Sequence, residues 1–252
     1  MKAPSMGVNI LQSIVIKKRL VINKGNGVEK VHWQGNTVEL RKLQERLREQ
    51  ISEAPLGRRP RTIGGADVSL NRGSKTVYAG IVVLDYETLQ PITQSGVVEE
   101  VEVPYVPGYL SFREVPALYR AWGGLELKPD VVMVDGHGIM HPRKMGVASH
   151  FGLAAEVPSL GCAKKPLSGE FIDPELLPGS ISTVKYQGEM RGFCYRSRKN
   201  SRPIFISPGT GMSCDDALEI TRHCLRGYRL PEPTRLAHLY VNQLRINSAI
   251  PT

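Results

Sequence analysis

The sequence contains few cysteines and no long apolar run, and each absence removes a class of protein. Its 252 residues include only four cysteines, without a C-x-x-C pair or zinc-site spacing: Cys162, Cys194, Cys214 and Cys224. We therefore expect reduced thiols in a cytoplasmic protein. No apolar run reaches the roughly 18 residues of a membrane-spanning helix. The apolar stretch 8–16 precedes basic residues at 17–19, the reverse of a secretory signal peptide. Neither secretion nor a membrane partner is expected.

Negative charge is comparatively scarce. Lysine and arginine number 33 against 24 aspartates and glutamates, which gives a net charge of +9. The excess is concentrated between residues 185 and 235, where ten basic residues accompany five acidic ones. A basic surface attracts polyanions, of which nucleic acid is the commonest. On charge alone, a solvated basic face that binds nothing fits equally well.

The order of predicted elements indicates an α/β fold with a mixed sheet. Residues 1–35 show no periodicity and predict a poorly ordered basic extension. A helix is then expected from Asn36, with an apolar stripe at Leu40, Leu43, Leu47 and Ile51. Strands are predicted at 62–69, 76–84, 97–103, 131–134 and 158–162, a turn at 71–73, a hairpin at 190–195 and 203–206, and helices at 111–122, at 142–156 and after Ser213. This order implies three antiparallel strands followed by parallel strands, with helices on the faces.

Two aspartates fall at strands that the pattern predicts to be buried. Asp67 lies inside the apolar stretch 63–69, and Asp135 directly follows the apolar run 131–134. A carboxylate there is costly unless a cation holds it. If the strands are neighbours, oxygen ligands without Cys or paired His favour Mg²⁺ or Mn²⁺ over Zn²⁺. Taken singly, each aspartate is more often a turn former.

Two further site candidates also have structural interpretations. Glu114 can complete a capping box with Ser111, or it can face the strand ends as a third acidic ligand. His238 stands alone, and by itself it predicts an ordinary surface or core histidine. His137 and His141 have zincin spacing, but glycine and proline interrupt the helix that such a site needs, so no zinc protease is expected.

A rigid aromatic turn and a lysine pair complete the candidates. Pro104 and Pro107 flank Tyr105 and hold it on stiff backbone, where it can stack on or wedge between bases, or pack on the core. Lys164, next to Lys165, can place an ammonium near the acidic cluster or belong to a solvated pair.

Five segments together resemble the endonuclease V family, the deoxyinosine 3′ endonucleases. They read PYVPGYLSFRE at 104–114, DGHGIMHPR at 135–143, ASHFG at 148–152, CAKK at 162–165 and GYRLPEPTR at 227–235. The resemblance extends in order from Leu40 to His238, with similar spacing. It implies an RNase H-like fold, and it implies an enzyme that nicks DNA at the second phosphodiester bond 3′ to deoxyinosine, with Mg²⁺ or Mn²⁺.

The resemblance also assigns site residues by position. It implies acidic metal ligands at Asp67, Glu114 and Asp135, a fourth metal-site position at His238, a catalytic lysine at Lys164 and a wedge at Tyr105. The pocket for the flipped base would include Gly108, Leu110, Gly136, His141 and Leu167. Thr210 departs from the family, because many members carry histidine there; if that histidine contacts DNA, the contact is weaker here.

The resemblance leaves the nucleic acid open. The expected organisation is the extension at 1–35, a catalytic domain at 36–241 and a tail at 242–252. The expected protein is a monomer that binds deoxyinosine-containing DNA. Two alternatives remain: an endoribonuclease that acts on inosine in RNA, and a non-catalytic nucleic-acid binder. The sequence does not separate DNA from RNA, because it does not show whether a 2′-hydroxyl is contacted.

Overall fold

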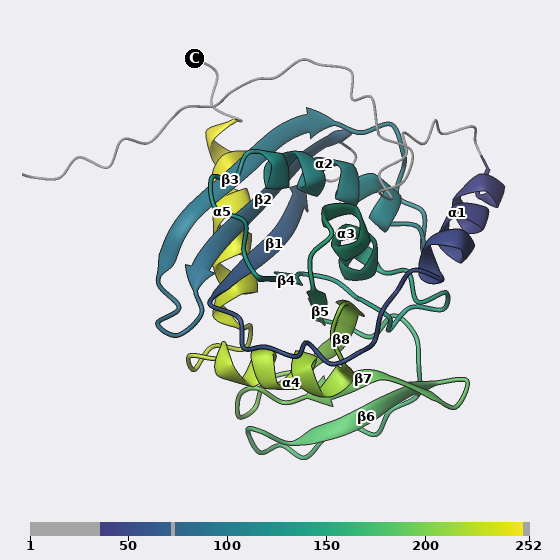
Figure 1. Ribbon diagram of the computed structural model, residues 1–252, viewed down its shortest axis with the longest axis vertical. Coiled ribbons are helices and arrows are strands. Elements are labelled where there is room, and N and C mark those ends of the chain that lie inside the picture. Colours follow the sequence, from purple (N-terminus) through teal and green to yellow (C-terminus); the bar gives the residue numbers. More distant parts are fainter. Residues whose placement is uncertain (1–35, 72–73, 249–252) are drawn as a thin grey trace, which may run out of the picture.

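One eight-stranded mixed sheet with helices on both faces organises the described part of the chain (Figure 1). The computed structural model describes residues 36–71 and 74–248, so the predicted extension at 1–35 and part of the predicted turn at 71–73 lie outside it. The helices are α1 (Val38–Arg48), α2 (Ser111–Gly123), α3 (Val147–Ala155), α4 (Cys214–His223) and α5 (Glu232–Asn247). The strands are β1 (Thr62–Leu70), β2 (Thr76–Asp85), β3 (Pro91–Glu100), β4 (Val131–Val134), β5 (Ser159–Ala163), β6 (Ile181–Tyr186), β7 (Glu189–Tyr195) and β8 (Ile204–Thr210).

The strand order β3-β2-β1-β4-β5-β8-β7-β6 confirms the predicted fold class. β1, β2 and β3 form an antiparallel meander, and β4 and β5 continue the sheet parallel to β1. The predicted hairpin is also present, since β7 pairs antiparallel with β8. Because β1 and β4 are parallel neighbours, their carboxyl ends meet at the same edge of the sheet. Ligand sites of open α/β sheets commonly lie at this edge.

Alternate residues of the strands supply two separate cores. Ala66 and Val134 face a core shared with α2 and α3, whereas Ile63 and Met133 face a core that includes α4 residues and partly buried α5 residues. In Figure 1, α5 runs across β1 to β3, and α2 lies over β2 and β3 with α3 next to it. Because α2 and α5 pack in different cores, they cover opposite faces of these strands. α1 packs in a smaller cluster with Val103, Phe112 and Met145, beside the turn that precedes α2.

Three predicted elements were wrong in their bounds. β3 spans Pro91–Glu100 rather than 97–103, because this edge strand pairs polar residues such as Gln94 with β2 and lacks an apolar signal in its first half. α3 begins at Val147 rather than at residue 142, because turns occupy the segment before it. The predicted strand at 203–206 continues to Thr210. β6 was not predicted, since its outer position leaves it mostly polar and exposed.

The single helix predicted after Ser213 is two helices. Ser213 caps α4 as predicted, through a capping box with Asp216. The chain then turns, and α5 begins after Pro231 and continues to Asn247, so the boundary expected at residue 241 falls inside this helix. None of the helices in the described ranges has the length and apolar character needed to cross a membrane.

Candidate active site

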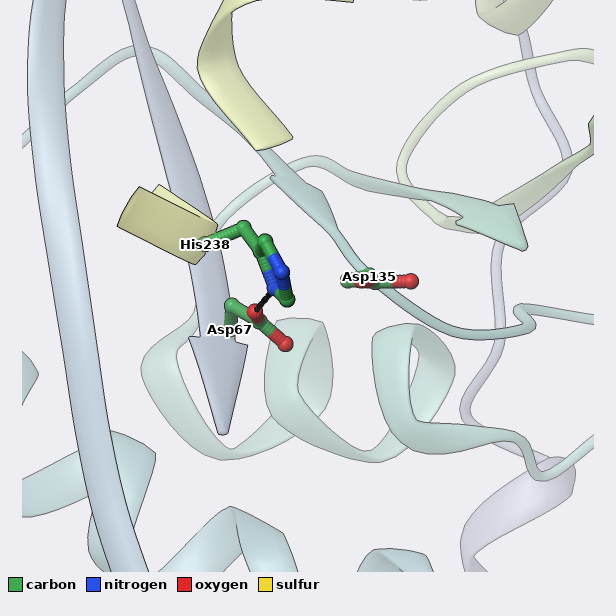
Figure 2. Close-up of side chains that lie close together, drawn as sticks. All are labelled: Asp67, Asp135 and His238. Atoms are coloured by element: carbon green, nitrogen blue, oxygen red, sulfur yellow. Dashed lines mark hydrogen bonds and ion pairs between the residues drawn. The ribbon is translucent and has the colours of Figure 1, made fainter. Parts of the chain in front are cut away.

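Asp67, Asp135 and His238 come together at the carboxyl ends of β1 and β4 (Figure 2). The pairing of Ala66 with Val134 places the two aspartates side by side, and the Asp135 amide donates to the Ala66 carbonyl at 2.9 Å. One ligand atom from each of the three side chains lies within 4.8 Å of the others. The convergence expected of the aspartates is therefore present, and it includes the histidine.

α5 brings His238 to this edge because β1 carries glycine where the helix crosses it. A Cβ on Gly65 would lie 1.8 Å from the Pro233 carbonyl oxygen, so only glycine admits the start of α5. His238 Nδ1 donates to Asp67 Oδ2 at 2.8 Å, and this bond raises the pKa of the imidazole. The Asn242 side-chain amide donates to His238 Nε2 at 3.1 Å and to the His238 carbonyl at 2.8 Å, which fixes the ring.

Glu114 enters the site from the first turn of α2 as a buried carboxyl. Burial, followed by the charges of Asp67 and Asp135, raises its pKa to about 8. The capping-box interpretation was wrong: α2 has no side-chain cap, and the Ser111 hydroxyl is buried without a hydrogen bond. Glu114 therefore has no capping role and faces the same pocket as the two aspartates.

The donor set fits a hard divalent cation. Burial, and then the charge of the neighbouring Asp67, raise the pKa of Asp135. A divalent ion held by carboxylate oxygens would offset this repulsion. The three residues with converging ligand atoms are Asp67, Asp135 and His238, and Glu114 adds a third acidic group at the pocket wall.

Lys164, just beyond β5, forms an ion pair with Asp135. The solvated-pair interpretation of Lys164 was therefore wrong. Its backbone is held in turn by Arg229, whose Nη2 donates to the Lys164 carbonyl at 2.9 Å and to the Pro203 carbonyl at 3.0 Å. Arg229 lies in the segment 227–235 that carries the resemblance, but no role was predicted for it. For Asn242 the only signal was its helical i, i+4 spacing from His238.

A pocket of about 280 Å³ opens beside the acidic residues. Its lining includes all but one of the residues expected to form the wedge turn and the base pocket: Tyr105, Pro107, Gly108, Leu110, Gly136, His141 and Leu167. Pro104 is not part of the lining. Tyr105 is 65% exposed, so the interpretation that it packs on the core was wrong.

Three other polar residues have structural partners. His137 Nε2 donates to the Lys165 carbonyl at 2.9 Å and His141 Nε2 donates to the Gly108 carbonyl at 3.1 Å, so these rings are used in backbone contacts rather than in a zinc site. Thr210 is buried, and its hydroxyl accepts a hydrogen bond from the Ser52 amide at 3.1 Å. The hydroxyl thus ties β8 to the segment after α1.

Comparison with known proteins agrees with this geometry. The family model for Endonuclease V matches residues 45–239. The Endonuclease V of Myxococcus xanthus is 45% identical over 214 residues, which cover 84% of this chain and 91% of that protein. The crystal structure of Endonuclease V from Streptomyces avermitilis is 32% identical, with a TM-score of 0.80, covering 86% of this chain and 96% of that one.

A more distant structure carries nucleic acid. Ciona intestinalis Endonuclease V, 24% identical with a TM-score of 0.72, covers 83% of this chain and 98% of that one. It shares the fold, and it was crystallised with a 24mer DNA containing an inosine followed by a ribo-adenosine. The family match over residues 45–239 and the Myxococcus relative together show that this chain belongs to the endonuclease V family of nucleases.

Proposed function

We propose that this protein is a metal-dependent endonuclease that nicks DNA at the second phosphodiester bond 3′ to deoxyinosine, in the repair of deaminated adenine. The observation that carries the proposal is the convergence of Asp67, Asp135 and His238 next to a pocket of about 280 Å³. The family supplies the reaction class, and the inosine-containing DNA bound by the Ciona relative supports the substrate.

Mg²⁺, with Mn²⁺ able to substitute, is the ion proposed for the site. Asp67 and Asp135 would hold it, with Glu114 and His238 beside them. When bound, such an ion makes hydroxide available near neutral pH and neutralises phosphate charge.

The protein groups around the proposed ion would position the scissile phosphate. The Lys164 ammonium, which forms an ion pair with Asp135, would neutralise charge that builds on the phosphate during attack. Water attacks the phosphorus in line with the 3′ oxygen, and the bond between phosphorus and that oxygen breaks. The products then carry 3′-hydroxyl and 5′-phosphate ends.

The adjoining pocket is proposed to receive the lesion base. Hypoxanthine pairs weakly, so it leaves the base stack at lower cost than a normal base. Tyr105, exposed on its stiff turn, would fill the gap left in the duplex. A hydrogen-bond donor in the pocket would donate to the carbonyl oxygen of hypoxanthine and would reject the exocyclic amine of adenine, which is itself a donor.

Inosine in RNA is a second candidate substrate. The DNA in the Ciona complex has a ribo-adenosine after the inosine, so a ribose next to the lesion is a substrate feature to test here.

We also propose that the protein is a cytoplasmic monomer whose catalytic domain begins near residue 36. All four cysteines are free thiols, which fits a reducing compartment.

The direct test is nicking of an inosine-containing duplex with Mg²⁺. We expect Asp67→Ala and Asp135→Ala to abolish cleavage while binding to the duplex is largely retained. Asp215→Ala removes the same charge from the exposed first turn of α4, outside the pocket lining, and should leave cleavage intact. Chelation of divalent ions should stop the wild type, and Mn²⁺ should restore it. Robust cleavage by either site variant contradicts the proposed metal role.

Matched DNA and RNA substrates decide between the two nucleic acids. The same sequence with one inosine is presented as duplex DNA and as single-stranded RNA, and the products are sized. Cleavage of RNA alone would replace the proposed DNA activity with the endoribonuclease alternative. Inosine binding without cleavage of either would leave a non-catalytic binder.

A further inference from the structure

Gln44 is a fully buried polar side chain in the apolar stripe of α1. It lies on the same side of the helix as Leu40, Leu43 and Leu47, and its exposed fraction is 0%. Burying an amide costs free energy unless its donors and acceptor are hydrogen-bonded. A leucine would suit the core at this position better, so the hydrogen bonds of the amide must account for its presence.

The Gln44 amide binds two segments that are distant in the sequence. Its Nε2 donates to the Gly108 carbonyl at 3.0 Å, and its Oε1 accepts a hydrogen bond from Arg143 Nε. Gly108 has a φ of +79°, which favours glycine, and it lies three residues after Tyr105. Gln44 therefore ties α1 directly to the turn that presents this tyrosine.

The same carbonyl oxygen receives two further donors. Arg143 Nη2 donates to it at 2.9 Å, and His141 Nε2 donates at 3.1 Å. His141 Nδ1 accepts from the Arg143 amide at 3.1 Å, and the Arg143 guanidinium lies 4.6 Å from the centre of the Tyr109 ring. Donors from α1 and from the segment after β4 thus converge on one peptide group.

We infer that Gln44 is a positioning residue that sets the turn 104–110 against the pocket and thereby sharpens the preference for inosine over undamaged nucleic acid. The inference rests on the proposed function, because Tyr105, Gly108 and Leu110 line the pocket that would receive the base. Gln44 itself is buried beneath this turn and touches no substrate. Its loss should widen the range of positions that the turn adopts, which weakens recognition more than the chemical step.

Two substitutions separate the contacts of the amide. Gln44→Met keeps the length of the side chain and removes both hydrogen bonds. Gln44→Glu keeps an acceptor for Arg143 but puts an oxygen against the Gly108 carbonyl. In both variants we expect KM for an inosine duplex to rise about tenfold, as expected for the loss of a buried hydrogen bond. The kcat should stay at the wild-type value, and the preference for the inosine duplex over a matched adenine duplex should fall.

Leu43→Ala is the matched control, because Leu43 lies next to Gln44 in α1 and packs in the apolar cluster of that helix, with a side chain that cannot hydrogen-bond to Gly108. It should lower the melting temperature and leave the preference for inosine unchanged. The inference is overturned if the Gln44 variants keep the preference, if their kcat falls at constant KM, or if Leu43→Ala loses the preference equally.

Hydrogen exchange of the free protein provides a readout independent of cleavage. Peptides covering 104–110 should exchange faster in Gln44→Met than in the wild type and in Leu43→Ala. A wild type that does not discriminate inosine contradicts the proposed function. In that case hydrogen exchange still tests whether Gln44 holds the turn. If the peptides covering 104–110 exchange at the wild-type rate in Gln44→Met, the positioning role of Gln44 is overturned as well.

Discussion

His141 is held as a neutral ring by contacts on both of its nitrogens. Its Nε2 donates to the Gly108 carbonyl and its Nδ1 accepts from the Arg143 amide. Burial, followed by the nearby positive charge of Arg143, lowers the pKa of the imidazole to about 4 from an ordinary 6.5. Protonation would remove the acceptor at Nδ1 and add a charge beside a guanidinium.

This lowered pKa predicts acid sensitivity. Between pH 7 and pH 5 the unfolded chain gains a proton at residue 141 and the folded chain does not, so stability falls as the pH falls, by about 2 kcal/mol from this side chain. In His141→Asn that part of the pH dependence should disappear. Urea unfolding of both proteins at pH 7 and pH 5, without divalent ions, measures it. Equal stability differences between the proteins at the two pH values would contradict the assigned pKa.

Single residues were predictable where a neighbouring pattern constrained them. Asp67 and Asp135 were identifiable because each interrupts or ends an apolar strand. His238 had no such context: its partner Asp67 lies 171 positions away, and only the family resemblance suggested it. Gln44 did carry a signal, a polar residue in an apolar helical stripe, but the sequence does not show which backbone group it binds.

The contact between β1 and the start of α5 decides where His238 lies. These two elements pack so closely that a Cβ on Gly65 would overlap the backbone of Pro233, at 1.8 Å from its carbonyl oxygen. A backbone atom cannot move aside as the end of a flexible side chain can, so the helix as a whole must shift.

Gly65→Ala should therefore damage both stability and catalysis. We expect a loss of about 3 kcal/mol, as for an overpacked core, and a drop in cleavage beyond what the unfolded fraction explains, because α5 carries His238 away from Asp67. Urea unfolding and nicking at a temperature where the variant is folded measure the two effects. Gly123→Ala, at the end of α2 with open space around its Cβ, is the control and should be nearly neutral. Wild-type activity in folded Gly65→Ala would mean that the packing does not position the histidine.

Elements buried on both faces were predictable, and peripheral elements were not. β4 and its neighbour β5 form apolar runs because both of their faces are covered. β6 and the first half of β3 lie at the two edges of the sheet, where backbone pairing rather than side-chain burial holds them. α5 begins with a proline-rich segment and exposes much of its surface, so its helical period was obscured.

At the scale of the whole molecule, positive charge stands close to the active site. Arg229 Nε donates to the Arg202 carbonyl at 2.9 Å while its Nη2 binds the Lys164 carbonyl, so the loop between β7 and β8 lies beside the segment that carries Lys164. Arg198 and Lys199 are exposed on this loop. Arg58 and Arg59 precede β1, at the opposite ends of β1 and β4 from the acidic site, where Arg58 pairs with Asp130.

The salt dependence of duplex binding should distinguish the charges at 198–199 from those at 58–59. The salt slope is the slope of the logarithm of the binding constant against the logarithm of the salt concentration. Removing one ion pair with a DNA phosphate lowers the size of this slope by about 0.9. The double variant Arg198→Gln, Lys199→Gln should bind inosine and adenine duplexes more weakly by a similar factor, with a slope smaller by about 1 to 2, because phosphate contacts carry no sequence information. The control, Arg58→Gln with Arg59→Gln, removes the same net charge from the far end of the strands and should leave the slope unchanged. Titrations at several salt concentrations measure all three proteins. If both double variants weaken binding equally, the attraction comes from net charge alone and the loop does not bind phosphate locally.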